Sequence, residues 1–154
     1  MNLKKVISLS LIIAVFALPS LLSAHCQVPC GIYGDTLRIK LMKEHVQTIE
    51  KSMNTITKLQ KKQTNKNQLV RWVNNKDEHA EKFSEIVTYY FMSQRIKPAE
   101  PENETAYKKY QDQIEILHKM LVYAMKSKQT TDLDNVEKLR ELIKKFKDTY
   151  FHEH

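Results

Sequence analysis

The chain has 154 residues, 42% of them hydrophobic, and its 25 lysines and arginines outnumber 18 aspartates and glutamates, giving a formal net charge of +7. This length suits one domain with a single core and excludes a large multidomain protein. Only two glycines are present, which leaves little scope for the tight hairpins of a β-rich fold. The charges are spread along the chain, as on a solvated surface, rather than gathered in one block.

Residues 1–24 have the pattern of an export signal. Two lysines precede an apolar run over residues 6–18, and a stretch of small residues ends at Ala24. The run is short for a membrane span, so we expect cleavage by a signal peptidase and no stable membrane anchor. His25 separates Ala24 from the first cysteine, which argues against lipidation. The mature protein would have 130 residues and a net charge of about +5, in the periplasm or secreted, where no nucleic-acid partner is expected.

Both cysteines of the chain, Cys26 and Cys30, lie in the segment HCQVPCGIY at residues 25–33. A disulfide between them would close a very small loop and restrict the unfolded chain little. Cleavage before His25 would free its α-amine, so that this amine, the His25 imidazole and the two thiolates lie within six residues. A planar set of donors could then consist of this amine, the amide nitrogen of Cys26 and the two thiolates, with the imidazole in an axial position. Such a set favours nickel(II) or copper(II) over tetrahedral zinc.

This donor set is typical of a metal that changes its oxidation state. Thiolates are strong donors that stabilise a higher oxidation state, and an axial imidazole that binds on oxidation adds to this effect. Pro29 and Gly31 suit a tight reversal that brings Cys30 back beside Cys26. The segment therefore predicts a redox metal site rather than a structural one.

The residues after Gly34 show helical periodicity, with apolar residues three and four positions apart. Asp35 or Thr36 is the expected cap of the first helix, which ends in the polar run 61–66. The buried residues predicted for four successive helices are Met42, Val46, Ile49, Met53, Ile56 and Leu59; Leu69, Trp72, Val73, Ala80, Phe83, Ile86, Val87, Tyr90 and Phe91; Tyr107, Tyr110, Ile114, Leu117, Leu121 and Ala124; and Leu133, Val136, Leu139, Ile143, Phe146 and Tyr150.

Short polar or proline-containing loops separate these four segments. Pro98 and Pro101 interrupt the chain between the second and third helices, and Thr131 is the expected cap of the fourth. Four amphipathic helices with short connections predict an all-α, antiparallel up-down-up-down four-helix bundle over residues 35–154. A metal-binding hook at residues 25–34 is expected to precede it.

The segment His25-Cys26-Gln27-Val28-Pro29-Cys30-Gly31-Ile32-Tyr33 resembles the nickel hook of the nickel-dependent superoxide dismutases, whose pattern is H-C-x-x-P-C-G-x-Y at the mature N-terminus. The chain is also similar to this family in its length and its four helices. The resemblance implies one nickel ion per subunit, bound by the amine and imidazole of His25, the amide and thiolate of Cys26, and the thiolate of Cys30. It also implies a homohexamer that converts superoxide to dioxygen and hydrogen peroxide by cycling between nickel(II) and nickel(III).

The resemblance assigns roles to residues beyond the ligands, and at one position the chain departs from the family. Tyr33 would control the approach of superoxide to the metal, and Tyr90 is the candidate for a second gate. The family's glutamate that hydrogen-bonds the axial imidazole has its counterpart at Lys40, in the context R-I-K. A lysine cannot accept the imidazole proton. Glu44 and His79 are the candidates to take its place.

Two alternatives to the enzyme use the same residues. An exported helical protein with this hook would carry or buffer copper or nickel without catalysis. A purely structural bundle would join its two cysteines in a small disulfide. Metal content separates the structural alternative from the other two, and redox cycling separates the enzyme from the metal carrier.

Overall fold

The computed structural model describes residues 30–62 and 65–151. The predicted export signal and the hook residues His25, Cys26 and Pro29 lie outside these ranges. The described residues fall into two units, one ending at Tyr33 and one beginning at Gly34.

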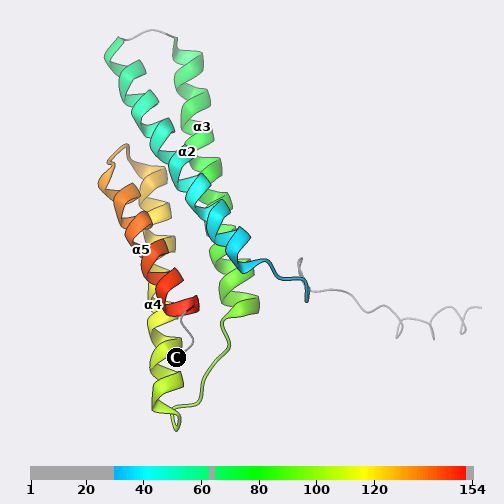
Figure 1. The fold of residues 1–154 in the computed structure, drawn as a ribbon. Coiled ribbons are helices and arrows are strands. Elements are labelled where there is room, and N and C mark those ends of the chain that lie inside the picture. Colours follow the sequence, from blue (N-terminus) through cyan, green and yellow to red (C-terminus); the bar gives the residue numbers. More distant parts are fainter. Residues whose placement is uncertain (1–29, 63–64, 152–154) are drawn as a thin grey trace, which may run out of the picture. The chain divides into compact units, whose positions relative to one another are not determined.

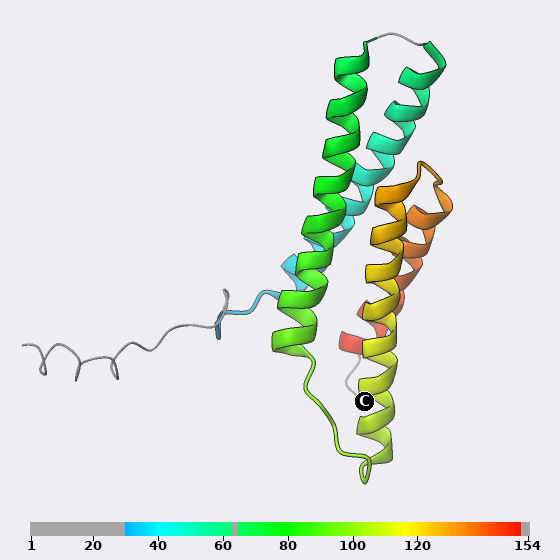
Figure 2. The same cartoon turned by 180° about the vertical axis from the view of Figure 1, so that it is seen from behind.

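The unit that begins at Gly34 is a helical bundle. Its elements are α2 (Asp35–Lys62), α3 (Lys66–Glu85), the π-helix η2 (Ile86–Arg95), α4 (Glu104–Gln129) and α5 (Asp134–Phe151). Because η2 continues α3, the elements form four rods, and consecutive rods run in opposite directions (Figures 1 and 2). Helix α2 packs against α3 and α5, and α4 packs against α3 and α5. The predicted all-α bundle is thus confirmed over the described residues. None of the helices described is both long enough and apolar enough to cross a membrane.

The second rod differs from the prediction in its last ten residues. The α-helix ends at Glu85 and the chain continues as a π-helix to Arg95, beyond the predicted end of the buried stripe at Phe91. The amide of Ile96 donates to the carbonyl of Phe91 at 2.8 Å, which closes the last π turn. Hydrophobic spacing of three and four residues is compatible with either helix type, so the sequence pattern did not predict this change.

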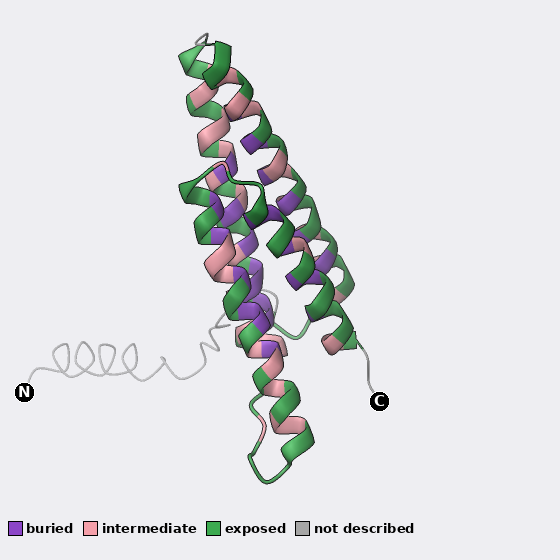
Figure 3. Ribbon diagram, turned by 90° about the vertical axis from the view of Figure 1, so that its left-hand side faces the viewer, coloured by how far each residue is buried: buried purple, intermediate pink, exposed green. Residues whose placement is uncertain are grey.

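The core lies where the four rods run side by side, and Figure 3 shows its buried residues along their middle. The end of α2 and the beginning of α3 project beyond α4 and α5 (Figure 1). Residues 57–62 and 65–72 in these ends are only half-buried or exposed. The largest fully buried side chains are those of Phe83, Phe91, Phe146, Met42, Ile49, Met53, Ile56, Leu117, Met120, Leu139, Ile143 and Val46. Most of the predicted buried residues of α2, the second rod and α5 are therefore confirmed.

Two of the predicted helix faces need correction. In α4 the buried face includes Ile116 and Met120, whereas the predicted Tyr110, Ile114 and Leu121 are only partly buried against the core. Leu133 is 39% exposed and precedes α5 instead of packing inside the bundle. These errors arise because the sequence period fixes a stripe only to within about one residue, and neighbouring helices decide which side of it is covered.

The start of α5 also differs from the prediction, because Asp132 and not Thr131 provides the side-chain acceptor. The Oδ1 atom of Asp132 accepts a hydrogen bond from the amide of Asp134, the first residue of α5, at 3.0 Å. An aspartate at this position satisfies an amide that the helix itself leaves without a partner.

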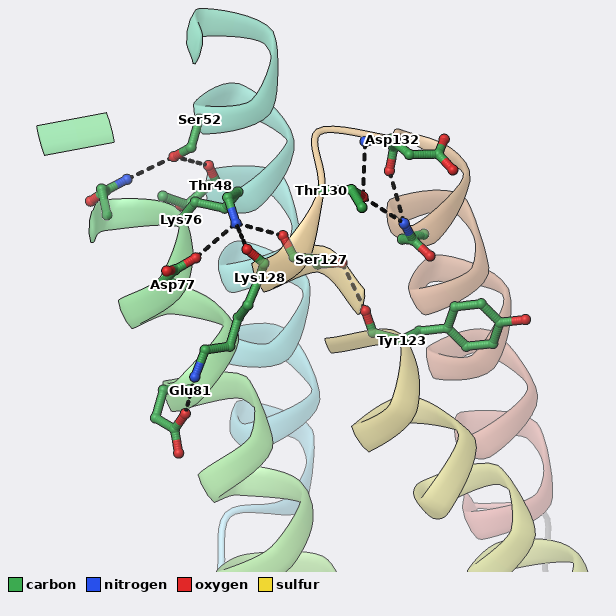
Figure 4. A network of polar contacts seen from close by, with 12 residues as sticks. Thr48, Ser52, Lys76, Asp77, Glu81, Tyr123, Ser127, Lys128, Thr130 and Asp132 are labelled. Carbon is green, nitrogen blue, oxygen red and sulfur yellow. Dashed lines mark hydrogen bonds and ion pairs between the residues drawn. The ribbon is translucent and has the colours of Figure 1, made fainter. Parts of the chain in front are cut away.

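A buried lysine ties α3 to the end of α4 (Figure 4). The Lys76 side chain is only 3% exposed, and its Nζ atom donates to the carbonyls of Ser127 at 2.7 Å and Lys128 at 2.5 Å. It also forms an ion pair with Asp77 at 2.7 Å. The last carbonyls of a helix lack partners within it and carry the negative end of its dipole. Lys76 therefore acts as a C-terminal cap of α4 supplied by a neighbouring helix.

Candidate metal centre

The described part of the hook comprises residues 30–34. Cys30 is an exposed free thiol. Gly31 has a φ angle of 77°, a left-handed conformation that glycine adopts without strain. A Cβ atom at Gly31 would meet no other atom within 4 Å, so backbone conformation rather than crowding favours glycine there. Tyr33, which is 43% exposed, follows this bend, and the reversal predicted to bring Cys30 back beside Cys26 involves residues outside the described ranges and stays a prediction.

The donor chemistry of the hook fits nickel. The described residues contain no group of three or more histidine, cysteine, aspartate or glutamate side chains able to hold a metal ion. The exposed Cys30 thiol, the second cysteine four residues before it and the neighbouring histidine supply sulfur and nitrogen donors. Such donors select late transition metals rather than magnesium or calcium. A nickel site in this chain would therefore be built by the hook rather than by the described part of the bundle.

The last residue of the hook and the first residue of α2 are held by a cluster that we call the Asp35 anchor, made of Gly34, Asp35, Tyr90, Arg95 and Tyr150. The Gly34 amide donates to the Tyr90 hydroxyl at 2.8 Å, and that hydroxyl donates to Asp35 Oδ1 at 2.5 Å. Arg95 binds the same carboxylate through both oxygens, at 2.9 Å from Nε to Oδ1 and 2.7 Å from Nη2 to Oδ2. The Tyr150 hydroxyl donates to Oδ2 at 2.7 Å. One carboxylate thus joins α2, η2 and α5.

The π-helix explains how Tyr90 and Arg95 reach one carboxylate. In an α-helix, with 3.6 residues per turn, side chains five positions apart point about 140° away from each other. In a π-helix the residues at i and i+5 are hydrogen-bonded neighbours, so their side chains share a face. The guanidinium of Arg38, one turn into α2, lies 4.9 Å from the centre of the Tyr90 ring and adds a cation–π contact on that side.

The charges in the Asp35 anchor are fixed over the physiological pH range. Burial raises the pKa of Asp35, but hydrogen bonds from Arg95, Tyr90 and Tyr150 outweigh burial and hold that pKa below its usual value. Burial and the hydrogen bond to Asp35 raise the pKa of Tyr90 to about 12, and the same two effects raise the pKa of Tyr150 to about 12. Both tyrosines therefore remain donors, and Asp35 remains an acceptor.

The structure brings together some of the residues predicted around the metal. Lys40 and Glu44 form an exposed ion pair at 3.9 Å on one face of α2. Tyr90 is 3% exposed and belongs to the Asp35 anchor. His79 lies against His45 of α2, with 3.0 Å between their Nδ1 atoms. The predicted roles of these residues toward the axial imidazole stay predictions.

Apart from Tyr90, the members of the Asp35 anchor were not predicted from the sequence as functional residues. Asp35 or Thr36 was expected to cap α2, but Asp35 is the first residue of α2 and its carboxylate binds Arg95, Tyr90 and Tyr150. Tyr150 was expected in the core and is partly buried. The available signals were an aspartate directly after the hook and a single arginine at the end of a largely apolar segment. Neither signal shows that the two residues meet, because they are 60 positions apart.

The sequence profile of one protein family, described as nickel-containing superoxide dismutase, matches residues 20–154. The match takes in the hook and all four rods of the bundle. The chain belongs to the nickel-containing superoxide dismutases. This nickel superoxide dismutase is accordingly an oxidoreductase that acts on superoxide and uses nickel. Neither a curated protein nor a solved structure matched the chain.

Proposed function

We propose that this nickel superoxide dismutase is exported, cleaved after Ala24, and active through a nickel ion held by the hook at residues 25–34. The observation that carries the proposal is the hook pattern itself. It agrees with the family pattern at every fixed position, in a chain that matches the family over residues 20–154. Cleavage is part of the proposal because only then does His25 have a free α-amine.

In this proposal the hook residues bind nickel through both nitrogen and sulfur atoms. His25 would hold nickel through its amine and imidazole, Cys26 through its amide nitrogen and thiolate, and Cys30 through its thiolate. When bound, nickel supplies one-electron chemistry between nickel(II) and nickel(III), which turns two superoxide ions and two protons into dioxygen and hydrogen peroxide. Pro29 would shape the turn that returns Cys30 to Cys26, and Gly31, with a φ angle of 77°, would let the chain leave Cys30 in a left-handed conformation.

Two tyrosines have different parts in this proposal. Tyr33 is 43% exposed and directly follows the hook turn, which supports a role in limiting access to the metal. The hydroxyl of Tyr90 lies between the Gly34 amide and the Asp35 carboxylate. These bonds support a role for Tyr90 in holding the chain immediately beyond the hook, in addition to the predicted role as a second gate.

Glu44 is the better candidate to accept the axial imidazole proton in place of the family's glutamate. Its carboxylate is exposed and, among the described residues, forms a long ion pair with Lys40 at 3.9 Å, so acceptor capacity remains. His79, the second candidate, is engaged with His45. Replacing Glu44 with glutamine keeps an acceptor oxygen but removes the charge, so we expect weaker activity rather than loss of nickel.

A homohexamer is proposed from the family resemblance. The bundle carries large apolar side chains that its own core leaves exposed, and these give it surface to bury against other copies. Those with more than half of their surface exposed are Leu37, Val70, Tyr89, Met125 and the hook residue Ile32. Size-exclusion chromatography with light scattering measures the assembly directly, and a monomer at micromolar concentration would contradict the proposal.

The experiment that tests the proposed function compares two nickel-reconstituted proteins. One begins at His25, and the other carries one extra residue before His25, which turns the α-amine into an amide. We expect rapid superoxide dismutation only from the first. If neither protein turns over although both bind nickel, the chain is a metal carrier rather than an enzyme. A Cys30→Ser variant, which loses one thiolate, serves as the inactive control.

Tyr33 has its own test. We expect a Tyr33→Phe enzyme to lose activity faster than the wild type when incubated with hydrogen peroxide, because peroxide then reaches the thiolates more easily. Equal rates of inactivation would show that the Tyr33 hydroxyl does not limit access.

A further inference from the structure

Two histidines outside the hook converge on one point between α2 and α3. The Nδ1 atoms of His45 and His79 are 3.0 Å apart, and the centres of the two rings are 5.0 Å apart at an angle of 65°. Both side chains are half-buried. Two neutral imidazoles at this distance share one N–H···N hydrogen bond, so the pair needs no other partner to be stable.

The same geometry suits two ligands of one metal ion. Histidine nitrogens bind zinc at about 2.0–2.1 Å, so two of them on one ion are separated by about 2.9 Å at a right angle and about 3.3 Å at a tetrahedral angle. The observed 3.0 Å falls between these values. A metal ion would therefore need only a small displacement of the rings, together with transfer of one proton from Nδ1 to Nε2 of the donating imidazole.

The surroundings keep both imidazoles neutral, as metal ligands must be. Burial lowers the pKa of His45, assisted by the electrostatic interactions with Lys82 and with the protonated form of His79, while Glu44 opposes the shift. Burial and Lys82 likewise lower the pKa of His79, and Glu78 opposes it. The ammonium of Lys82 is held by Glu78 at 2.6 Å. No third histidine, cysteine or acidic residue among the described residues completes the site, which leaves coordination positions for water.

We propose that His45 and His79 form a second transition-metal site, built from residues other than those of the hook, that binds a divalent ion such as zinc through the two Nδ1 atoms. Borderline ions of this kind prefer imidazole, whereas magnesium and calcium do not. The bound ion cross-links α2 and α3, and binding to the folded state alone raises the stability of the bundle. The proposal does not depend on dismutase activity.

Zinc binding to protein that begins at His25 and already holds nickel tests the proposal. After equilibrium dialysis against zinc, elemental analysis measures zinc and nickel in the same sample, so displacement from the hook would be seen at once. We expect about one zinc per chain in the wild type and at least tenfold weaker binding in His79→Gln. The matched control is His118→Gln, which removes an exposed histidine outside the pair and should leave zinc binding unchanged.

Two further measurements keep the result unambiguous. If the hook does not retain nickel, the same comparison is made in a chain with serine at both hook cysteines, so a failure of the proposed function is distinguished from a failure of this one. Long-range ¹H–¹⁵N NMR should show both Nδ1 resonances shifting on zinc addition, and His45→Gln should abolish the shift of His79. Equal zinc binding by the wild type and His79→Gln, or no binding by either at millimolar zinc, would overturn the proposal.

Discussion

Replacing Asp35 with asparagine is expected to destabilise the bundle strongly, because this carboxylate is the centre of the anchor beyond the hook. Four hydrogen bonds converge on it, two from Arg95 and one each from Tyr90 and Tyr150. Asparagine has the same shape but no charge, and its NH₂ group replaces one of the two acceptor oxygens with a donor. At least two of the four bonds are therefore lost, and those that remain are no longer charge-assisted.

The size of the effect follows from the burial of the cluster. Hydrogen bonds to charged groups contribute about 1.5–3 kcal/mol each, and breaking a buried ion pair costs about 3–5 kcal/mol. The side chains of Asp35 and Arg95 are 17% and 28% exposed, so water recovers part of this loss. We expect the free energy of unfolding to fall by about 3 kcal/mol. That change is about 150-fold in the unfolding equilibrium.

The assay is equilibrium urea unfolding of nickel-free protein beginning at His25, followed by circular dichroism at one protein concentration. Glu50→Gln is the matched control, because Glu50 and Arg140 also join two helices at 2.6 Å but are 34% and 36% exposed. We expect this more exposed pair, without the two tyrosine donors of the anchor, to contribute about 1 kcal/mol or less. If Asp35→Asn costs no more than Glu50→Gln, the anchor is not a stabilising centre and our reasoning is wrong.

The pH dependence offers a second check on the same residue. The pKa of Asp35 is lowered in the folded state, so its contribution is fully present above the unfolded pKa of 3.8. That contribution is lost as the pH falls through the lower, folded value. The difference in stability between the wild type and Asp35→Asn should therefore be constant from pH 5 to 7 and shrink below pH 4.

Three other predictions concern the bundle and the approach of substrate. Lys76→Met should lower the free energy of unfolding by about 2 kcal/mol, because two carbonyls at the end of α4 lose their donor. Asp77→Asn should lower it by less than about 1 kcal/mol, and urea unfolding of both variants checks this difference. The pKa values of His45 and His79 are lowered in the folded state, so the unfolded state binds more protons and the stability of nickel-free protein should fall as the pH drops below 6.5. A double His45→Gln, His79→Gln variant whose free energy of unfolding fell as steeply with pH as that of the wild type would contradict this. For nickel-loaded enzyme, kcat/KM for superoxide should fall several-fold as salt rises, because the basic surface attracts an anion; no salt dependence would exclude electrostatic steering.

Much of the fold could be predicted because helical periodicity is a local property. Spacings of three and four residues identified four amphipathic segments, and the breaks at residues 61–66 and around Pro98 separated them. Which residues of each helix are buried was predicted less accurately. Met120, which the predicted stripe omitted, is fully buried, and Leu133, which it included, is exposed. A stripe fixes an approximate direction on the helix surface, and packing against two neighbours decides the rest.

The sequence by itself determined which donors the hook offers, because the histidine and both cysteines lie within six positions and their spacing along the chain is enough to predict a chelate. Only the tertiary structure decided how the chain is held beyond the hook. Asp35 meets Tyr90, Arg95 and Tyr150 across separations of 55, 60 and 115 residues. A π-helix that periodicity does not distinguish from an α-helix turns Tyr90 and Arg95 to one face. Contacts of this kind depend on the path of the backbone through space, and a local pattern of side chains does not contain that information.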